Sequence, residues 1–307
     1  MARLAQQGIA PTAVNLRIAQ QMLRYGLPLS PDGIDQIRQL WQALGAMSLT
    51  DLEALIALFS FGLPVDAARM QAMVQLLSGG PTSHLLARLT MALKRAGGQG
   101  GDLEALKNLL SSYWKLGNGP ESFAKEIGQF QQIMDKLRAL LENPALLLTE
   151  KLPQEVATEL NALRQLLQAQ TMLQRSPSSG LYIPFFQWRD QQPMPAELLV
   201  QTDRDPAAQA AQYTNLTLSV DTRNLGRLTL DFTALRGNLG VRFDVQDAVI
   251  KRLVESDFAK LRRRLTTATG YIVAGLSVEE IGQGRSISLL LPRRRDVRKL
   301  GRAIGII

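Results

Sequence analysis

The side chains that could carry out acid–base or metal chemistry are few and isolated. His84 is the single histidine, and it stands near the start of an expected helix. No second ligand lies three or four positions away, which is the spacing that a zinc-binding helix uses. Because a lone imidazole holds neither a metal nor a proton relay, we interpret His84 as a surface or capping residue and expect no metal site.

Two pairs of acids, Asp203/Asp205 and Glu279/Glu280, have the residue type of general acid–base catalysis. Two carboxylates take separate acid and base roles only where their surroundings push their pKa values apart. The first pair falls in an expected loop, and the second closes an expected strand. We therefore interpret all four as solvated acids without a catalytic role.

Motifs for phosphate binding and for nucleophilic catalysis are missing from the sequence. Gly282-Gln283-Gly284 is followed by neither Lys-Ser/Thr nor a helix, and no Gly-x-Ser-x-Gly sequence occurs. The chain has no cysteine, which excludes disulfides, thiolate nucleophiles and cysteine-ligated metals. We expect no catalytic residue, no cofactor and no small-molecule substrate. The chain is therefore predicted to be an interaction protein and not an enzyme.

The composition is that of a folded protein with room for two domains. The 307 residues are 46% apolar and 20% charged, close to globular averages. The N-terminus lacks the apolar stretch of a secretory signal, and no window approaches the roughly 18 apolar residues that span a bilayer. We expect a cytoplasmic protein, and export by a signal that is not hydrophobic stays open.

The first half of the chain has the apolar spacing of helices. Two of these helices end in nearly the same phrase, because Tyr25-Gly26-Leu27-Pro28-Leu29 recurs 36 residues later as Phe61-Gly62-Leu63-Pro64-Val65. Glycine supplies the left-handed residue after a helix, and proline prevents the helix from continuing. Ser30 or Asp32, and then Asp66, stand where the next helix needs a cap. We predict two copies of a helix–Gly-Leu-Pro–helix unit within a small helical bundle. Further helices are expected over residues 82–94, 102–115, 121–142 and 153–174.

After residues 176–180, a Ser/Pro/Gly linker, the apolar spacing changes to alternation. Alternating residues predict one-sided antiparallel strands, in which Thr217 and Ser219 lie on the face opposite the leucines. Asn224-Leu225-Gly226 supplies a turn between two of them. A helix capped by Asp247 and ended by Gly270 is expected to cover one face of the sheet. Strands are expected at residues 182–185, from 198, and at 214–220, 227–232, 239–245, 271–278 and 286–291.

The predicted fold class is an all-α part followed by an α+β part. Residues 1–175 form a helical bundle with the two-copy repeat, and 176–180 form the linker. Residues 181–291 form a two-layer domain, in which one long helix covers a mainly antiparallel sheet. Residues 292–307 form a basic amphipathic tail.

The order of elements from about residue 181 to 280 resembles the C-terminal domain of flagellar hook-length control proteins. The segment from Leu216 to Phe232, two alternating strands around the Leu225-Gly226 turn, is similar to the central motif of that family. The rest of the family's order is also present. It consists of a further strand, a helix with the step Leu261-Arg262, and a glycine before a closing strand. One departure is Thr222, where many members carry proline.

The resemblance implies a role in bacterial flagellum assembly. The domain would contact the cytoplasmic part of the export-gate switch protein of a flagellar or related type III secretion apparatus and would help to switch the class of exported substrate. The compact helices of residues 1–175 differ from the long polar ruler of the family, which leaves hook-length measurement open. Export of the chain itself through the flagellar-type apparatus also stays open.

Much of the net charge of +8 lies at the C-terminus. From Arg285 onward, seven basic residues and one acid give +6, which leaves +2 for residues 1–284. The tail has apolar residues at helical spacing beside this charge, so it fits an amphipathic segment or a solvated end. The partner contacts are expected on the turn, the arginine-rich helix face and the tail: Asn224, Leu225, Gly226, Arg262, Arg263, Arg264, Arg293, Arg294, Arg295, Arg298 and Lys299.

Two alternatives remain open. The first is a non-specific nucleic-acid or anionic-membrane binder that acts through the basic tail. Nucleic acid is disfavoured, because the rest of the chain offers neither aromatic platforms nor a second basic groove. The second alternative is a scaffold unrelated to secretion, which would bind its partners through the helical half.

Overall fold

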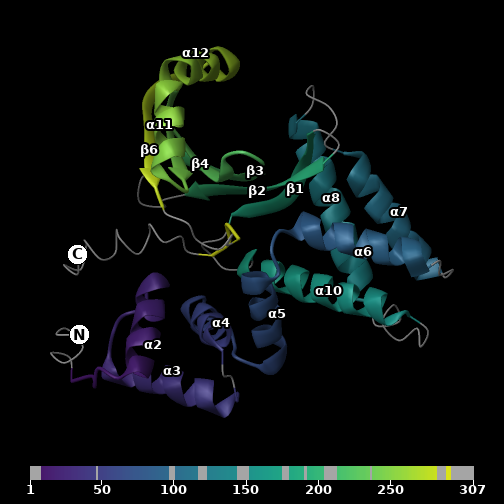
Figure 1. Ribbon diagram of the computed structural model, residues 1–307, viewed down its shortest axis with the longest axis vertical. Coiled ribbons are helices and arrows are strands. Elements are labelled where there is room, and N and C mark those ends of the chain that lie inside the picture. The colour runs from purple at the N-terminus through teal and green to yellow at the C-terminus, as the bar shows by residue number, and fades with distance from the viewer. Residues whose placement is uncertain are drawn as a thin grey trace. The chain divides into compact units, whose positions relative to one another are not determined.

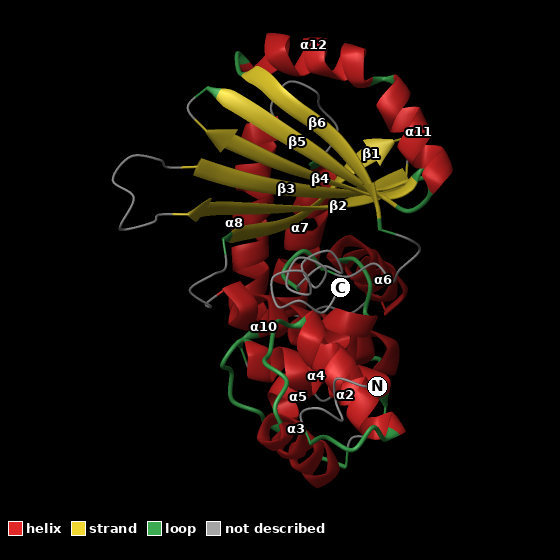
Figure 2. Ribbon diagram, turned by 90° about the vertical axis from the view of Figure 1, so that its left-hand side faces the viewer, coloured by secondary structure: helices red, strands yellow, loops and turns green. Residues whose placement is uncertain are grey.

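The computed structural model confirms a mixed α+β chain with its helices in the N-terminal half and its sheet in the C-terminal half (Figures 1 and 2). It describes residues 8–45, 48–96, 101–116, 123–143, 152–174, 180–189, 192–203, 213–235, 237–281 and 288–291. Most of the predicted linker and the whole predicted tail, 292–307, lie outside these residues.

Contacts divide the chain into two compact units. The first contains α2 to α5 and the C-terminal part of α10, and the second contains α6 to α8, the rest of α10, and the sheet with α11 and α12. The sequence placed all helices up to residue 175 in one domain. The grouping differs because the rings of Tyr113 on α7 and Phe130 on α8 pack at an angle against Phe186 of the first strand, with centroids 5.0 and 5.4 Å away.

Two helices of the first unit begin at the predicted caps. Ser30 accepts a hydrogen bond from the backbone of Gly33 at 3.1 Å, and Asp66 accepts one from Arg69 at 2.8 Å. Both Gly26 and Gly62 have a left-handed backbone, with φ of 70° and 65°. The residue after each glycine donates to the carbonyl five positions earlier, at 2.8 and 2.9 Å, so the two turns have the same geometry. Besides the C-terminal part of α10, the helices of this unit are α2 (Ala13–Arg24), α3 (Pro31–Ala43), α4 (Leu49–Ser60) and α5 (Ala67–Ser78).

The helices of the second unit follow the predicted ranges closely. They are α6 (Thr82–Ala96), α7 (Gly101–Lys115) and α8 (Phe123–Leu141), with the N-terminal part of α10 (Gln154–Gln174). Ion pairs join α6 to α10, between Arg88 and Glu159 at 3.0 Å and between Arg95 and Glu155 at 2.8 Å. These pairs are largely exposed, so the buried leucines of both helices contribute most of the stability.

The sheet has six described strands, whose spatial order is the order along the chain. Neighbouring strands are antiparallel except β5 and β6, which are parallel. The parallel pair requires a crossover, which the last two helices provide (Figure 2). The elements are β1 (Leu181–Arg189), β2 (Gln192–Asp203), β3 (Tyr213–Thr222), β4 (Gly226–Leu235), β5 (Asn238–Val245), α11 (Ala248–Ser256), α12 (Phe258–Thr269) and β6 (Ile272–Glu280).

The single long helix expected after Asp247 is two helices. The chain leaves the helical conformation at Asp257, which has φ −96° and ψ 2°, and α12 runs in a different direction from α11 (Figure 1). The change of direction keeps one apolar stripe on the sheet, because Ile250 of α11 and Phe258 and Leu261 of α12 all pack on the core cluster around Phe243.

The strand expected at residues 286–291 is absent from the part that the structure describes. Residues 288–291 form a turn instead. The backbone N–H of Leu289 donates to the carboxylate of Glu197 at 3.0 Å, so a side chain takes the place of a neighbouring strand as its partner.

Burial on the sheet also differs from the expectation of one buried apolar face. Thr217 and Ser219 of β3 are buried, at 6% and 1% exposure, whereas Leu216 and Leu218 are only half-buried. Alternation correctly separates the two faces, but it does not tell which one is covered.

Candidate interaction surface

The predicted contact turn, Asn224-Leu225-Gly226, is held by a side chain that precedes it. The Oγ1 of Thr222 accepts a hydrogen bond from the backbone of Leu225 at 3.0 Å and donates to the carbonyl of Gly226 at 2.8 Å. This hydroxyl therefore fixes the turn at the position where the resemblance leads one to expect proline. Asn224 is exposed, and Leu225 packs against the core cluster under α11 and α12. Of the turn's two side chains, that of Asn224 is therefore the more accessible to a partner.

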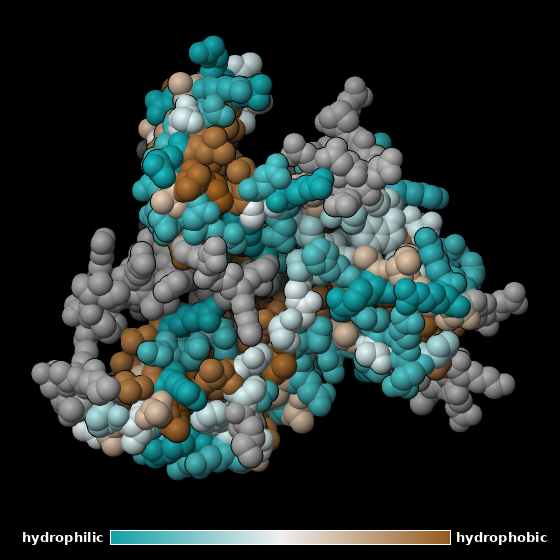
Figure 3. Space-filling model, in the orientation of Figure 1, coloured by the Kyte–Doolittle hydropathy of each residue, from teal (hydrophilic) through white to brown (hydrophobic). Residues whose placement is uncertain are grey.

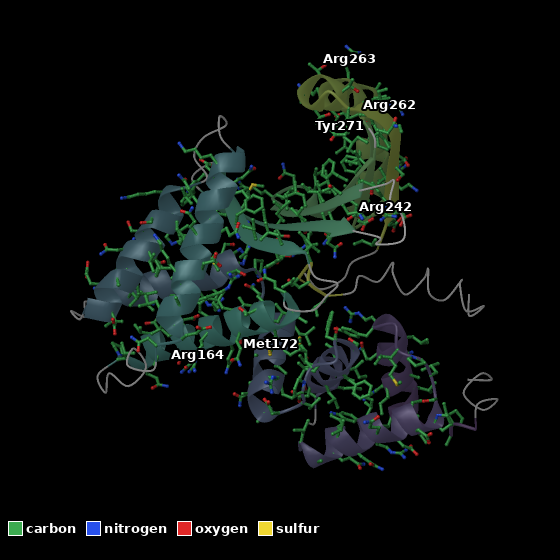
Figure 4. All side chains as sticks on the ribbon, turned by 180° about the vertical axis from the view of Figure 1, so that it is seen from behind. Arg164, Met172, Arg242, Arg262, Arg263 and Tyr271 are labelled. Carbon is green, nitrogen blue, oxygen red and sulfur yellow. The ribbon has the colours of Figure 1, made fainter. Side chains whose placement is uncertain are left out.

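The predicted arginine-rich face lies on α12. Arg262, Arg263 and Arg264 are exposed, and none of them forms an ion pair with a described residue. Figure 4 shows Arg262 and Arg263 at the end of the sheet that α12 covers. Leu261 packs against the same cluster as Leu225, so the turn and α12 both contact one hydrophobic core. The other predicted contact residues, Arg293, Arg294, Arg295, Arg298 and Lys299, lie outside the described residues.

An apolar surface on α11 was not predicted. Val249 is 67% exposed and Leu253 is 52% exposed, and hydrophobic surface gathers over this helix in Figure 3. Ile272, at the start of β6, is 68% exposed. Neither Val249 nor Leu253 was predicted to be exposed. Their spacing of four residues was the available signal, because it aligns two side chains on one helix face beside the buried one.

The opposite face of the sheet carries charged side chains that are largely buried. Arg227 of β4 reaches across β3, where its Nε donates to the hydroxyl of Ser219 at 2.6 Å and its Nη2 lies 2.9 Å from the carboxylate of Glu197. Burial, and next the Glu197 carboxylate, raise the pKa of the Tyr182 phenol well above its ordinary value. The alternation of residues along one strand could not have predicted this cluster, because Tyr182, Glu197 and Arg227 lie on three different strands.

A second ion pair lies on the same face. Arg242 of β5 is 3.0 Å from Asp231 of β4, which accepts a hydrogen bond from Thr217 at 2.7 Å. Asp244 is 1% exposed, 4.0 Å from the guanidinium of Arg242. The opposite charges face each other across strands, so this arrangement stabilises strand register rather than preparing an acid and a base.

Of the residues considered for catalysis, those that the structure describes are not assembled into a site. Asp203, which was expected in a loop, is the last residue of β2, and Asp205 lies outside the described residues. His84 is exposed on α6, and Glu279 and Glu280 are exposed at the end of β6. The described residues contain no group of three His, Cys, Asp or Glu side chains arranged to hold a metal ion. Among the described helices, none has the length and apolar character to cross a membrane.

Comparison with known proteins adds no relative. No family model, no curated protein and no solved structure matches this chain.

Proposed function

We propose that this chain is a non-enzymatic interaction protein of the hook-length control type. Its partner would be the cytoplasmic domain of the export-gate switch protein of a flagellar or type III secretion apparatus, and contact would influence the switch in substrate class. The observation that supports this most is on the α11–α12 pair, where exposed Val249 and Leu253 are followed along the chain by exposed Arg262, Arg263 and Arg264.

This surface has the chemistry of a protein contact. Exposed apolar side chains grouped on one helix lose contact with water when a partner covers them. Arginine forms bidentate hydrogen bonds with carboxylates and is enriched in protein interfaces. An apolar ridge on α11 with guanidinium groups on α12 therefore fits a partner surface that is apolar in one part and acidic in another.

We also propose roles for two parts of the chain. Residues 181–280 would act as the switch-contacting domain, and the two helix–Gly-Leu-Pro–helix segments would be copies of one unit. The equal hydrogen bonding around Gly26 and Gly62 supports the second statement. The identical lag of 36 residues between Ser30 and Asp66, which both cap the following helix, also supports it.

The test is titration calorimetry of the whole chain with a purified cytoplasmic fragment of an export-gate switch protein. Replacement of Arg262, Arg263 and Arg264 by Glu is expected to weaken binding at least tenfold, because attraction at a rim of arginines becomes repulsion. Replacement of Val249 and Leu253 by Ser is expected to weaken it similarly.

Matched controls are available on other helices. Lys125→Glu with Lys136→Glu reverses charges on α8, and Leu49→Ser removes a side chain that is 53% exposed on α4. These changes should leave binding within twofold. The proposal is wrong if the fragment does not bind the unmodified chain, or if it binds the α11 and α12 variants as well as the controls.

The two alternative functions predict different results for the same purified protein. A nucleic-acid or membrane binder would lose retention on heparin or anionic vesicles when residues 292–307 are deleted, with affinity that falls steeply with salt. A scaffold unrelated to secretion would keep its partners when the α11 and α12 surfaces are changed.

A further inference from the structure

A pocket of about 550 Å³ lies in the second unit, lined by side chains of α6, α7 and the first two strands. This volume is within the range of small-molecule sites in proteins. The pocket is separate from the α11–α12 surface, so an inference from it does not depend on the proposed function.

Two tryptophans form the aromatic part of the wall. The rings of Trp114 on α7 and Trp188 on β1 have centroids 6.1 Å apart and planes at 57°. The indole N–H of Trp114 donates to the hydroxyl of Thr90 at 2.9 Å, and that of Trp188 donates to the carbonyl of Leu116 at 3.1 Å. Both N–H groups are therefore engaged within the protein, and the rings offer apolar surface to an occupant.

The two rings are held in place before any ligand enters. Phe186 packs against both, with centroids 4.8 Å from Trp114 and 5.3 Å from Trp188. Phe186 itself is fully buried. A site whose walls are already fixed loses little conformational entropy when an occupant binds.

The charged part of the wall has one sign. Lys94 at the end of α6, and Lys107 and Lys115 on α7, line the pocket, and no acidic residue is among the described residues of its wall. Lys107 lies 3.8 Å from Glu104, which is largely exposed and outside the wall. The ammonium groups of Lys94 and Lys115 thus give the pocket a positive potential, whereas Glu104 offsets the charge of Lys107.

We propose that this pocket binds a small aromatic anion, whose ring system packs against Trp114 and Trp188 while its carboxylate or sulfonate pairs with Lys94 and Lys115. The ring pair selects an aromatic body through stacking and apolar burial. The lysines select a negative charge and disfavour a cation of the same shape.

The test compares two probes that differ by one group. 8-Anilinonaphthalene-1-sulfonate and N-phenyl-1-naphthylamine share an aromatic framework, and only the first carries a sulfonate. In the whole chain with Trp41→Phe, the remaining tryptophans are those of the pocket, so energy transfer to the probe reports binding there. The sulfonate is expected to bind about tenfold more tightly than the neutral probe at low salt.

Variants separate the two parts of the site. Lys94→Glu with Lys115→Glu should remove the preference for the sulfonate and leave the neutral probe within twofold. Met91→Glu, at a lining residue that is 50% exposed, should weaken both probes. Lys136→Glu on α8, and Val249→Ser with Leu253→Ser on α11, should change neither.

Three outcomes would overturn the proposal. One is equal affinity for the two probes, and another is a sulfonate affinity that is unchanged in the double lysine variant. The third is displacement of the sulfonate by decanoate at lower concentration than by 2-naphthoate, which would assign the pocket to aliphatic anions.

Discussion

The guanidinium of Arg227 on β4 lies 2.9 Å from the carboxylate of Glu197 on β2, across the whole width of β3. Both side chains are mostly buried, at 15% and 9% exposure. The hydroxyl of Ser219 on β3 lies between them and accepts from the same arginine, and Leu289 donates to the same carboxylate. One ion pair thus links three strands and the turn that follows the sheet.

Removal of one partner of this pair should be costly. Glu197→Ala removes the nearer of two carboxylates beside the largely buried Arg227 and leaves Asp221 at 3.8 Å, so we expect the free energy of unfolding to fall by about 3 kcal/mol. Glu197→Leu with Arg227→Met should recover more than half of that loss. The measurement is urea unfolding of the second unit. Arg88→Ala, which breaks a largely exposed pair, serves as the control and should cost about 1 kcal/mol or less. A loss that small in Glu197→Ala would show that the ion pair contributes little.

Buried phenols should make the protein sensitive to alkali. Burial raises the pKa of the Tyr113 phenol well above its ordinary value of 10.0. The folded state then keeps a proton that the unfolded state loses above pH 10. The stabilisation is complete below that pH and decreases as pH rises, by up to about 1.4 kcal/mol per pH unit for one group. The Tyr113 hydroxyl has no hydrogen-bond partner among the described residues, so Tyr113→Phe should not lower stability at pH 7. Unfolding free energies measured between pH 8 and 11.5 should decline less steeply in this variant, and an unchanged slope would refute the assignment.

The turn before β4 should depend on one hydroxyl. Thr222→Val keeps the branched shape and removes both hydrogen bonds to the turn, so we expect a loss of about 1–2 kcal/mol in unfolding free energy. Thr222→Ser keeps the hydroxyl and should lose less than half as much. Amide exchange of Leu225, whose N–H donates to this hydroxyl, should accelerate in Thr222→Val and not in Thr222→Ser. Equal exchange rates in the two variants would contradict this role.

Two left-handed glycines should respond alike to alanine. At Gly62 a new Cβ would meet nothing within 4 Å, so Gly62→Ala should cost about 1–2 kcal/mol from backbone strain alone. At Gly226 the Cβ would lie 2.3 Å from Oε1 of Gln246, which is the end of a flexible side chain that can move aside, so Gly226→Ala should also cost about 1–2 kcal/mol. Hydrogen exchange in each unit measures the two costs. A Gly226→Ala cost that exceeds that of Gly62→Ala and falls when Gln246→Ala is added would show that Gln246 does not move aside.

Local structure was largely predictable from the sequence, because it depends on neighbours along the chain. The caps Ser30 and Asp66, the stop at Gly26 and the alternation of β3 are all set within a few residues. The break at Asp257 was missed, because aspartate also occurs on the exposed faces of continuous helices.

Packing partners were not predictable in the same way. A helical stripe such as that of α8 must be buried, but nothing in its spacing shows that Phe130 packs edge-to-face against Phe186 of β1. The same limit applies to the candidate site. The turn and the arginines could be read from residue types, whereas the exposure of Val249 and the pairing of Arg227 with Glu197 depend on tertiary structure.

The parallel pairing of β6 has a consequence for how the sheet assembles. Among the described strands, β6 bonds to β5 alone, and the connection that holds α11 and α12 must close before the two strands can pair, which costs loop-closure entropy. Most of its side chains are exposed, with Val273 and Val278 as its buried anchors. We therefore expect β6 to join the sheet last during folding and to detach first under mechanical or thermal stress, while β2, β3 and β4 keep their pairing.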